Sequence, residues 1–158
     1  MVEWPGQLEV LLEVALAMIL GGLIGIEREI ADKPAGFRTN MLVAGAAALL
    51  VGLGDALLQR FADVGPGGDL IRSDPIRIVE AIVTGIAFLG AGTIFRRSRT
   101  EQVEGLTTAA SILLSGAIGI CVALRQFVLA VGVAVLTLLV LRGVRLVERM
   151  LNTRKKHV

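Results

Sequence analysis

Tyrosine is absent from this sequence, and aromatic residues of all kinds make up only 4% of it. Cysteine and histidine each occur once, as Cys121 and His157. A lone cysteine excludes a disulfide framework within the chain, and a lone histidine excludes zinc sites with the usual Cys and His spacing. The same scarcity leaves no legible set of nucleophile, histidine base and acid. We therefore expect no enzyme activity, no catalytic residues and no bound cofactor.

What the sequence does contain is aliphatic and small. Hydrophobic residues make up 54% of the 158 residues, and 19 glycines come in addition. Ordinary globular domains contain about 45–50% apolar residues when glycine is counted with them, and this chain clearly exceeds that share. Leucine, valine, isoleucine, alanine and glycine are typical of packed membrane helices. The composition therefore predicts an integral membrane protein.

Five apolar segments each approach the length of about 20 residues that a helix needs to cross a bilayer core. Glycine, proline and charged residues occupy the connections between them. We therefore predict an all-α, polytopic membrane bundle of about five transmembrane helices, which forms one domain over residues 1–158. The predicted spans are residues 8–26, 39–57, 76–95, 105–124 and 127–147.

Basic residues predict the orientation of this bundle. If the N-terminus is outside, most of the 16 Lys and Arg residues lie on the cytoplasmic side, as the positive-inside rule requires. The C-terminus is then cytoplasmic. More than half of the 14 acidic residues fall on the outer side or in outer helix halves, which would concentrate cations there. The simpler alternative is that acids are tolerated wherever positive charge is not selected.

In this orientation, four separated motifs meet at the cytoplasmic face. GGLIGIERE ends the first span and KPAGFRTN leads into the second, while FLGAGTIF ends the third and GLTTAAS opens the fourth. This convergence is the strongest indication of a functional site. The residues that we single out from these spans and motifs are Gly21, Gly25, Glu27, Arg28, Gly36, Arg38, Thr39, Gly85, Gly90, Gly92, Gly105, Thr107 and Thr108.

Small residues recur at every fourth position near these motifs, as in Ala17, Gly21 and Gly25. Such stripes let helix backbones approach closely, and we favour close packing as the role of the glycines. An alternative is that Gly90-Ala91-Gly92 opens the third helix and turns backbone carbonyls toward a cavity. The stripes exceed what one thin bundle needs, which predicts a homo-oligomer.

The polar residues of the motifs leave several interpretations open. Thr107 and Thr108 could cap the start of the fourth helix or face neighbouring helices. Glu27 and Arg28 could form an ion pair at the membrane interface that orients the first connection. They could equally bind an anionic lipid or partner with Arg38.

Carboxylates inside the spans are a second kind of candidate. A charged side chain at the bilayer centre costs at least about 2.5–3.5 kcal/mol on insertion scales. Glu9 and Glu13 continue the first small-residue stripe, and Glu80 lies three residues after Arg77, with which it can pair. Hard oxygen ligands suit Mg²⁺ or proton traffic, so Glu13 and Glu80 are candidate cation-handling residues. The alternative is that Glu9 and Glu80 are shallow enough to reach the interface.

The four motifs, in this order, resemble the membrane domain of the MgtC/SapB family of bacterial inner-membrane proteins. The resemblance covers nearly the whole chain. Two positions depart from it: Ala87 stands where the family commonly has the second glycine of GIGFLGAG, and Thr107 where well-studied members have asparagine in GLNTAA. The resemblance implies a role in adaptation to low magnesium. Longer members add a cytosolic ACT-like domain after the fifth span, and we expect this chain to lack it.

These observations predict a regulatory protein of magnesium homeostasis in the bacterial inner membrane. It would act through helix contacts with a partner membrane complex, and the resemblance implies the F-type ATP synthase as that partner. The alternative is a transporter or channel for Mg²⁺ or another small cation. The lipid bilayer and further copies of the chain are the other expected partners, and nucleic acid is not expected.

Overall fold

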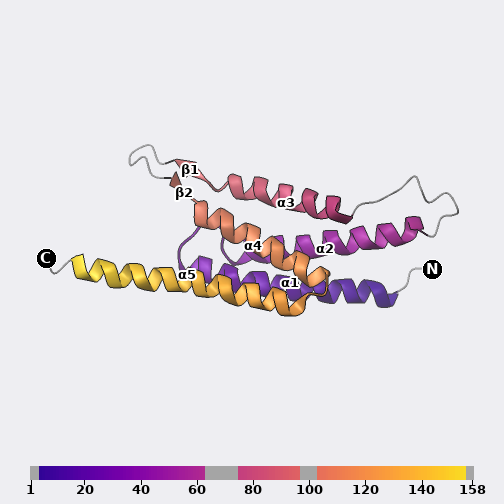
Figure 1. Ribbon diagram of the computed structural model, residues 1–158, viewed down its shortest axis with the longest axis horizontal. Helices are drawn as coiled ribbons and strands as arrows, with labels where there is room; N and C mark the ends of the chain where they lie inside the picture. The colour runs from indigo at the N-terminus through magenta and orange to yellow at the C-terminus, as the bar shows by residue number, and fades with distance from the viewer. Residues whose placement is uncertain (1–3, 63–74, 97–102, 156–158) are drawn as a thin grey trace.

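The computed structural model describes residues 4–62, 75–96 and 103–155, with side chains described for residues 6–59, 76–96 and 103–143. Over these residues the chain forms five helices and one pair of short strands. All five helices lie along the long axis of the molecule (Figure 1). The helices are α1 (Trp4–Ile30), α2 (Phe37–Ala62), α3 (Pro75–Ala91), α4 (Leu106–Ala123) and α5 (Phe127–Lys155).

Three of the described helices are long and apolar enough to cross a membrane, over Gly6–Ile30, Phe37–Gln59 and Leu106–Ala123. The apolar part of α5 that the structure describes is Phe127–Gly143, and α3 has 17 residues. Both are slightly shorter than the about 20 residues of a helix that spans a bilayer core. The predicted all-α polytopic membrane bundle is confirmed.

The third predicted span is wrong at its C-terminal end, because α3 ends at Ala91 and does not continue to residue 95. The Thr93 N–H and hydroxyl both donate to the Gly90 carbonyl, at 2.9 and 2.7 Å. The Ile94 N–H donates to the Ala91 carbonyl at 3.0 Å. These bonds form a tight turn that replaces the next helical turn. The Gly-Ala-Gly motif therefore ends a helix, and the Gly90 carbonyl is used within the turn.

A pair of two-residue strands follows α3, where no strand is predicted: Phe95 falls in the third predicted span and the other strand residues fall in the polar connection after it. Strand β1 (Phe95–Arg96) pairs antiparallel with β2 (Val103–Glu104), with Phe95 opposite Glu104. This pairing brings the end of α3 next to the start of α4. We call this end of the bundle, where α1 and α3 end and α2 and α4 begin, the hairpin end (Figure 1).

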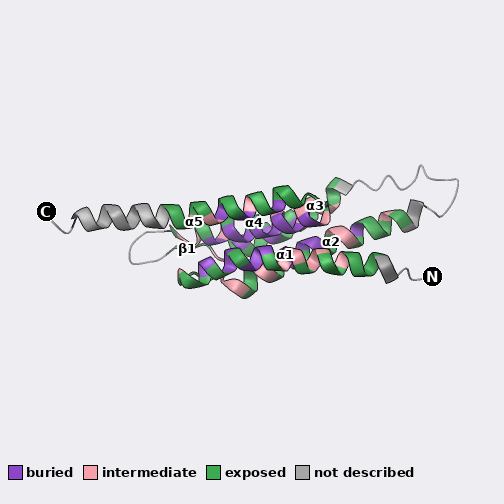
Figure 2. Ribbon diagram, turned by 90° about the horizontal axis from the view of Figure 1, so that it is seen from below, coloured by how far each residue is buried: buried purple, intermediate pink, exposed green. Residues whose placement is uncertain are grey.

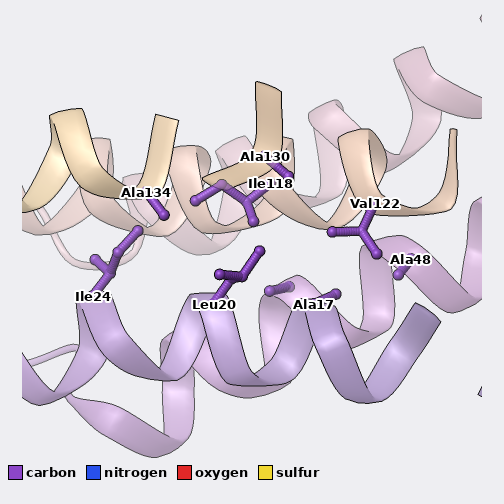
Figure 3. Packing of buried hydrophobic residues seen from close by; sticks show 9 residues of the cluster. Ala17, Leu20, Ile24, Ala48, Ile118, Val122, Ala130 and Ala134 are labelled. Atoms are coloured by element: carbon purple, nitrogen blue, oxygen red, sulfur yellow. The ribbon is translucent and has the colours of Figure 1, made fainter. Parts of the chain in front are cut away.

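Helix α4 contacts each of the other four helices and forms the centre of the bundle. Buried residues lie on the inward sides of the helices, and exposed residues cover the outside (Figure 2). One apolar cluster joins α1, α2, α4 and α5, and Figure 3 shows Leu20 and Ile24 of α1 facing Ile118 and Ala134. A second cluster joins α2, α3 and α4 and includes Val43, Ile82, Ile86 and Ile112.

Large apolar side chains on the outside of the bundle suit a lipid environment. Phe88 of α3 is 80% exposed and Val128 of α5 is 90% exposed. Many leucines of α1 and α2 are also exposed. Contiguous apolar surface of this kind is rare on soluble monomers, so the outside of the bundle agrees with a membrane protein.

Gly105 makes the start of α4 possible. Its φ of 93° lies in the left-handed region, and an added Cβ would run into the Thr93 carbonyl oxygen. Gly105 is the N-cap residue of α4, and none of the described side chains caps this helix by a hydrogen bond. The predicted capping role of Thr107 and Thr108 is therefore wrong. Thr107 is exposed, while Thr108 is buried and faces neighbouring helices, which was the other interpretation.

Replacing Gly105 by alanine should destabilise the bundle. A non-glycine residue in a sparsely populated backbone region costs about 1–3 kcal/mol, and the contact with the Thr93 carbonyl adds to that cost. Gly85→Ala is the matched control, because its added Cβ would meet no atom within 4 Å. The control should be neutral or stabilising by up to about 1 kcal/mol. Thermal or denaturant unfolding in detergent measures both, and equal stabilities for the two variants would contradict the expectation.

Candidate functional site at the convergent helix ends

The four sequence motifs do meet at one end of the molecule, as predicted. The C-terminal ends of α1 and α3 and the N-terminal ends of α2 and α4 lie together at the hairpin end (Figure 1). Polar side chains are buried along three of the four helices that meet there, α1, α2 and α4. We call these residues the buried polar set: Glu27, Arg28, Asn40, Thr108, Ser111 and Ser115.

Two glycines of α1 let the start of α2 approach the α1 backbone. A Cβ added at Gly21 would lie 2.6 Å from the Asn40 carbonyl oxygen, and one added at Gly25 would lie 2.6 Å from the Phe37 Cα. Both neighbours are backbone atoms, which cannot move aside as a flexible side chain can. Gly22 makes room for the Phe37 ring, whose nearest atom would be 2.8 Å from an added Cβ. Gly21 and Gly25 therefore allow the backbones of α1 and α2 to pack closely.

The opposite side of α2 approaches α4 in the same manner. A Cβ added at Gly119 of α4 would run into the Ala44 carbonyl oxygen. Helix α2 is therefore held between α1 and α4, with backbone close to backbone on both sides. We call this arrangement the glycine seam, made by Gly21, Gly25 and Gly119.

Asn40 joins three segments within the seam. The Ser115 hydroxyl of α4 donates to the Asn40 side-chain oxygen at 2.8 Å. The Asn40 amide nitrogen donates to the carbonyls of Ala35 and Gly36, each at 2.9 Å. Asn40 is 0% exposed, so these bonds replace all contact with water. Asn40 thus ties the first turn of α2 to the preceding connection and to α4.

The sequence carried a signal for Asn40 that the motif-based selection missed. Ala44, Ala48 and Gly52 recur every four residues, and Asn40 extends that stripe by one turn toward the start of α2. A polar residue on a small-residue stripe faces a neighbouring helix, where it needs a hydrogen-bond partner. Arg38 and Thr39, which were selected instead, are exposed.

Glu29 is a second residue that the selection missed. Its carboxylate accepts a hydrogen bond of 2.8 Å from the Phe37 N–H, the first residue of α2. A carboxylate at a helix N-terminus is stabilised by the helix dipole. A Cβ added at Gly36 would lie 2.8 Å from the Glu29 carboxylate, so Gly36 leaves room for this bond. Glu29 therefore fixes the connection between α1 and α2.

Glu27 and Arg28 are buried together at the end of α1, with exposed fractions of 2% and 3%. The Arg28 Nη1 atom and a Glu27 carboxylate oxygen are 3.9 Å apart, which is an ion pair at the long end of the usual range. The ion pair is one of the interpretations that the sequence leaves open. The Arg28 Nε and Nη2 atoms have no hydrogen-bond partner in the part of the chain that the structure describes. Unmade hydrogen bonds of a buried guanidinium are costly, which marks Arg28 as unusual.

The other glycines differ in their surroundings. Gly90 packs against Ala109 of α4, with an added Cβ 3.4 Å from the Ala109 Cβ. Gly92 lies in the turn after α3. A Cβ added at Gly85 would meet no atom within 4 Å, so Gly85 does not pack closely against another of the described residues.

The candidate acids lie elsewhere. Glu9 and Glu13 are both paired with Arg125 of the turn between α4 and α5, at 2.6 and 3.4 Å. Glu80 is exposed, and no ion pair joins it to Arg77 in the described structure, so that expected pairing is wrong. Among the described residues, no three His, Cys, Asp or Glu side chains are placed to hold a metal ion. A cation-handling role for Glu13 and Glu80 stays a prediction.

The chain matches the MgtC family over residues 14–150. This chain belongs to the MgtC family. Its fold of apolar helices and its family together make it a membrane protein. No solved structure matches it.

Proteins from several bacteria have sequences similar to this one. It is 39% identical to the Escherichia coli K12 protein named "Putative magnesium transporter YhiD" over 138 residues, which cover 84% of this chain and 59% of the relative. It is 32% identical to Protein SapB of Bacillus subtilis over 76% of this chain and 50% of the relative. It is 43% identical to Protein MgtC of Brucella abortus over 68% of this chain and 39% of the relative. The chain thus spans at most about three fifths of these relatives.

Removing the hydrogen bond between Asn40 and Ser115 should lower stability by a measurable amount. Side-chain hydrogen bonds between membrane helices couple by about 0.6 kcal/mol on average and by up to about 1.7 kcal/mol. We expect a double-mutant cycle of Asn40→Ala and Ser115→Ala to give a coupling in that range. Asn40→Ala should be the more damaging single change, because it also removes the side-chain donor to the carbonyls of Ala35 and Gly36. The Gly36 carbonyl keeps the backbone N–H of residue 40 as a donor.

Unfolding in detergent measures all members of the cycle. Thr39→Ala is the matched control, since Thr39 is exposed one residue away from Asn40. A coupling free energy of zero between Asn40 and Ser115 would contradict the assignment of Asn40 as the residue that ties α2 to α4. A loss of stability in Thr39→Ala as large as that in Asn40→Ala would contradict it as well.

Proposed function

We propose that this protein acts in the bacterial inner membrane as a regulatory member of magnesium homeostasis. It works through contacts with a partner membrane complex and is not an enzyme. Its membership of the MgtC family and the name of the YhiD relative support the link to magnesium. The partner that the family resemblance suggests is the F-type ATP synthase, and further copies of the chain are a second partner.

The glycine seam is the observation that carries a regulatory role over transport. An ion path along α1, α2 and α4 needs space between them, and the seam fills that space with backbone. At Gly21 and Gly25 even one added carbon would lie within 2.6 Å of backbone atoms of the α2 N-terminal turn. A rigid bundle of this kind suits a protein that presents surfaces to a partner.

The outer acids also support regulation. A cation that bound Glu9 or Glu13 would have to displace the Arg125 guanidinium, which is 2.6 Å from Glu9. The positive charge of Arg125 repels an approaching cation at the same place. We therefore propose that Glu13 stabilises the contact between α1 and the turn after α4.

The exposed apolar faces of α3 and α5 are the proposed partner surface. Helix α3 contacts α4 and α2 but leaves Phe88 80% exposed, and α5 leaves Val128 90% exposed. In a bilayer these side chains contact lipid until a partner helix replaces the lipid. Packing between helices then supplies the binding energy.

Transport of Mg²⁺ or another small cation is the second candidate. The name of the YhiD relative favours it, and Glu80 offers an exposed carboxylate on α3. A transport path in this case would form between copies of the chain, outside the glycine seam.

Reconstitution into liposomes that contain a magnesium-sensitive dye tests the proposal. A Mg²⁺ gradient is imposed with and without a pH or voltage gradient. We expect no flux above that of empty liposomes. A known Mg²⁺ channel in parallel vesicles shows that the assay detects transport. Flux that disappears in Glu13→Gln or Glu80→Gln would overturn regulation and establish transport.

Growth of a deletion strain at low Mg²⁺ gives a second readout. Glu13→Gln and Glu80→Gln should sustain growth like the unmodified chain, because neither carboxylate carries an ion in the proposed role. Membrane levels of each variant are measured by immunoblotting. Loss of growth in both variants at normal protein levels would contradict the proposal.

A further inference from the structure

The Arg28 guanidinium offers an unused hydrogen-bonding edge inside the bundle. Its Nε and Nη2 atoms lie on the same edge of the planar group, and both are buried without a hydrogen-bond partner in the described structure. That edge presents two parallel N–H donors, which match the two oxygens of a phosphate or carboxylate. Glu27 approaches a different atom, Nη1, at 3.9 Å. One edge of Arg28 therefore faces the carboxylate, while the other is buried with no hydrogen-bond partner in the described structure.

Helix register places Arg28 beside the first turns of α2 and α4. Gly21, Gly25 and Arg28 follow one another at spacings of four and three residues, which puts them on the same face of α1. Gly21 and Gly25 contact Asn40 and Phe37 of α2. Arg28 continues this line by about one turn, past the point where α2 begins.

The same argument applies to α4, which runs antiparallel to α1. Thr108, Ser111 and Ser115 are buried at spacings of three and four residues on one face. Ser115 is bonded to Asn40, so it lies at the level of Gly21. Thr108 is seven residues before Ser115, and Arg28 is seven residues after Gly21. At 1.5 Å per residue, Arg28 and Thr108 therefore both lie about 10 Å beyond this level.

Helix ends add positive potential at this level. Helices α2 and α4 both begin at the hairpin end, and the N-terminus of a helix carries a partial positive charge and free N–H groups. Neither helix has an acidic residue in its first turn, and no described side chain caps α4 by a hydrogen bond. At α2 the Glu29 carboxylate already accepts the Phe37 N–H, so α4 is the helix start that is used for this site. Phosphate groups bind readily at such helix starts.

The depth of Arg28 agrees with a phosphate ligand. Arg28 lies two residues before the end of the candidate span Gly6–Ile30. The end of a span lies at the depth of the lipid headgroups. Basic pockets between transmembrane helices at the cytoplasmic side bind phosphate-bearing headgroups. The predicted orientation puts the hairpin end on that side.

We propose that Arg28 anchors a phosphate-binding site at the hairpin end, in which the Nε and Nη2 edge holds two phosphate oxygens. The phosphate belongs to a phospholipid headgroup or to a soluble phosphate. Because only 4% of the Arg28 side chain is exposed, the group inserts beside the starts of α2 and α4. The site is independent of whether the protein regulates a partner or transports an ion.

Binding to the full chain in detergent tests this site with three probes. These are dioctanoyl phosphatidylglycerol, dioctanoylglycerol with the same chains and no phosphate, and sodium phosphate against sodium chloride at equal ionic strength. We expect phosphatidylglycerol to raise the Tm in a saturable manner and dioctanoylglycerol to leave it unchanged. A rise with sodium phosphate as well assigns the site to soluble phosphate, and its absence assigns the site to a headgroup. No rise with either phosphate probe would overturn the proposal.

Variants then locate the binding. Arg28→Gln should weaken phosphate binding by at least about tenfold, because two charged hydrogen bonds are lost. Arg28→Lys keeps the charge but loses the paired donors, so its affinity for phosphate should lie between those of Arg28→Gln and the unmodified chain. If Arg28→Gln does not fold, Arg28→Lys alone provides the test. Arg142→Gln removes the same charge from an exposed position on α5 and should change nothing. Unchanged binding in Arg28→Lys, or equal loss in Arg142→Gln, would refute the site.

Discussion

Helix α2 lies so close to α1 and α4 that glycine is required where the backbones meet. At Gly21, Gly25 and Gly119 a single added carbon would overlap backbone atoms of the neighbouring helix. Without a hydrophobic driving force between helices in lipid, such close contact supplies the attraction that holds a bundle together. The positions of the other helices follow from it, because α3 and α5 pack on the outside of α4. The starts of α2 and α4 and the end of α1 are brought together for the same reason.

The seam also explains why polar residues can be buried at one end of an otherwise apolar bundle. Within a membrane, unsatisfied polar groups must find partners inside the protein. Asn40 does so through the Ser115 hydroxyl and the carbonyls of Ala35 and Gly36. The exposed Glu29 carboxylate stabilises the same connection by accepting a hydrogen bond from the Phe37 N–H. Arg28 is the exception, because one edge of its guanidinium has no protein partner among the described residues.

Composition and periodicity were sufficient to predict the membrane bundle, its five helices and the convergence of four motifs. These features depend on long apolar runs, which the sequence displays directly. They also depend on the rule that successive membrane spans run in opposite directions. The predictions failed where a single backbone conformation decides the outcome. The end of α3 at Ala91 depends on how Thr93 bonds the Gly90 carbonyl, and the start of α4 depends on the positive φ of Gly105. The small-residue stripe of α2 pointed to Asn40 as a residue that faces a neighbouring helix, but its partner Ser115 is 75 residues away in the chain and could not be read from the sequence.

Replacing Gly119 by alanine tests the glycine seam most directly. The new Cβ would meet the Ala44 carbonyl oxygen, and overpacking of this kind costs about 1–3 kcal/mol. Gly132 of α5 is the matched position, since an added Cβ there would meet no atom within 4 Å. We predict that Gly119→Ala lowers the free energy of unfolding in detergent by about that amount, while Gly132→Ala is neutral or stabilising. Equal stability of the two variants would show that α2 and α4 are not held in backbone contact, and would contradict the seam as the basis of the structure.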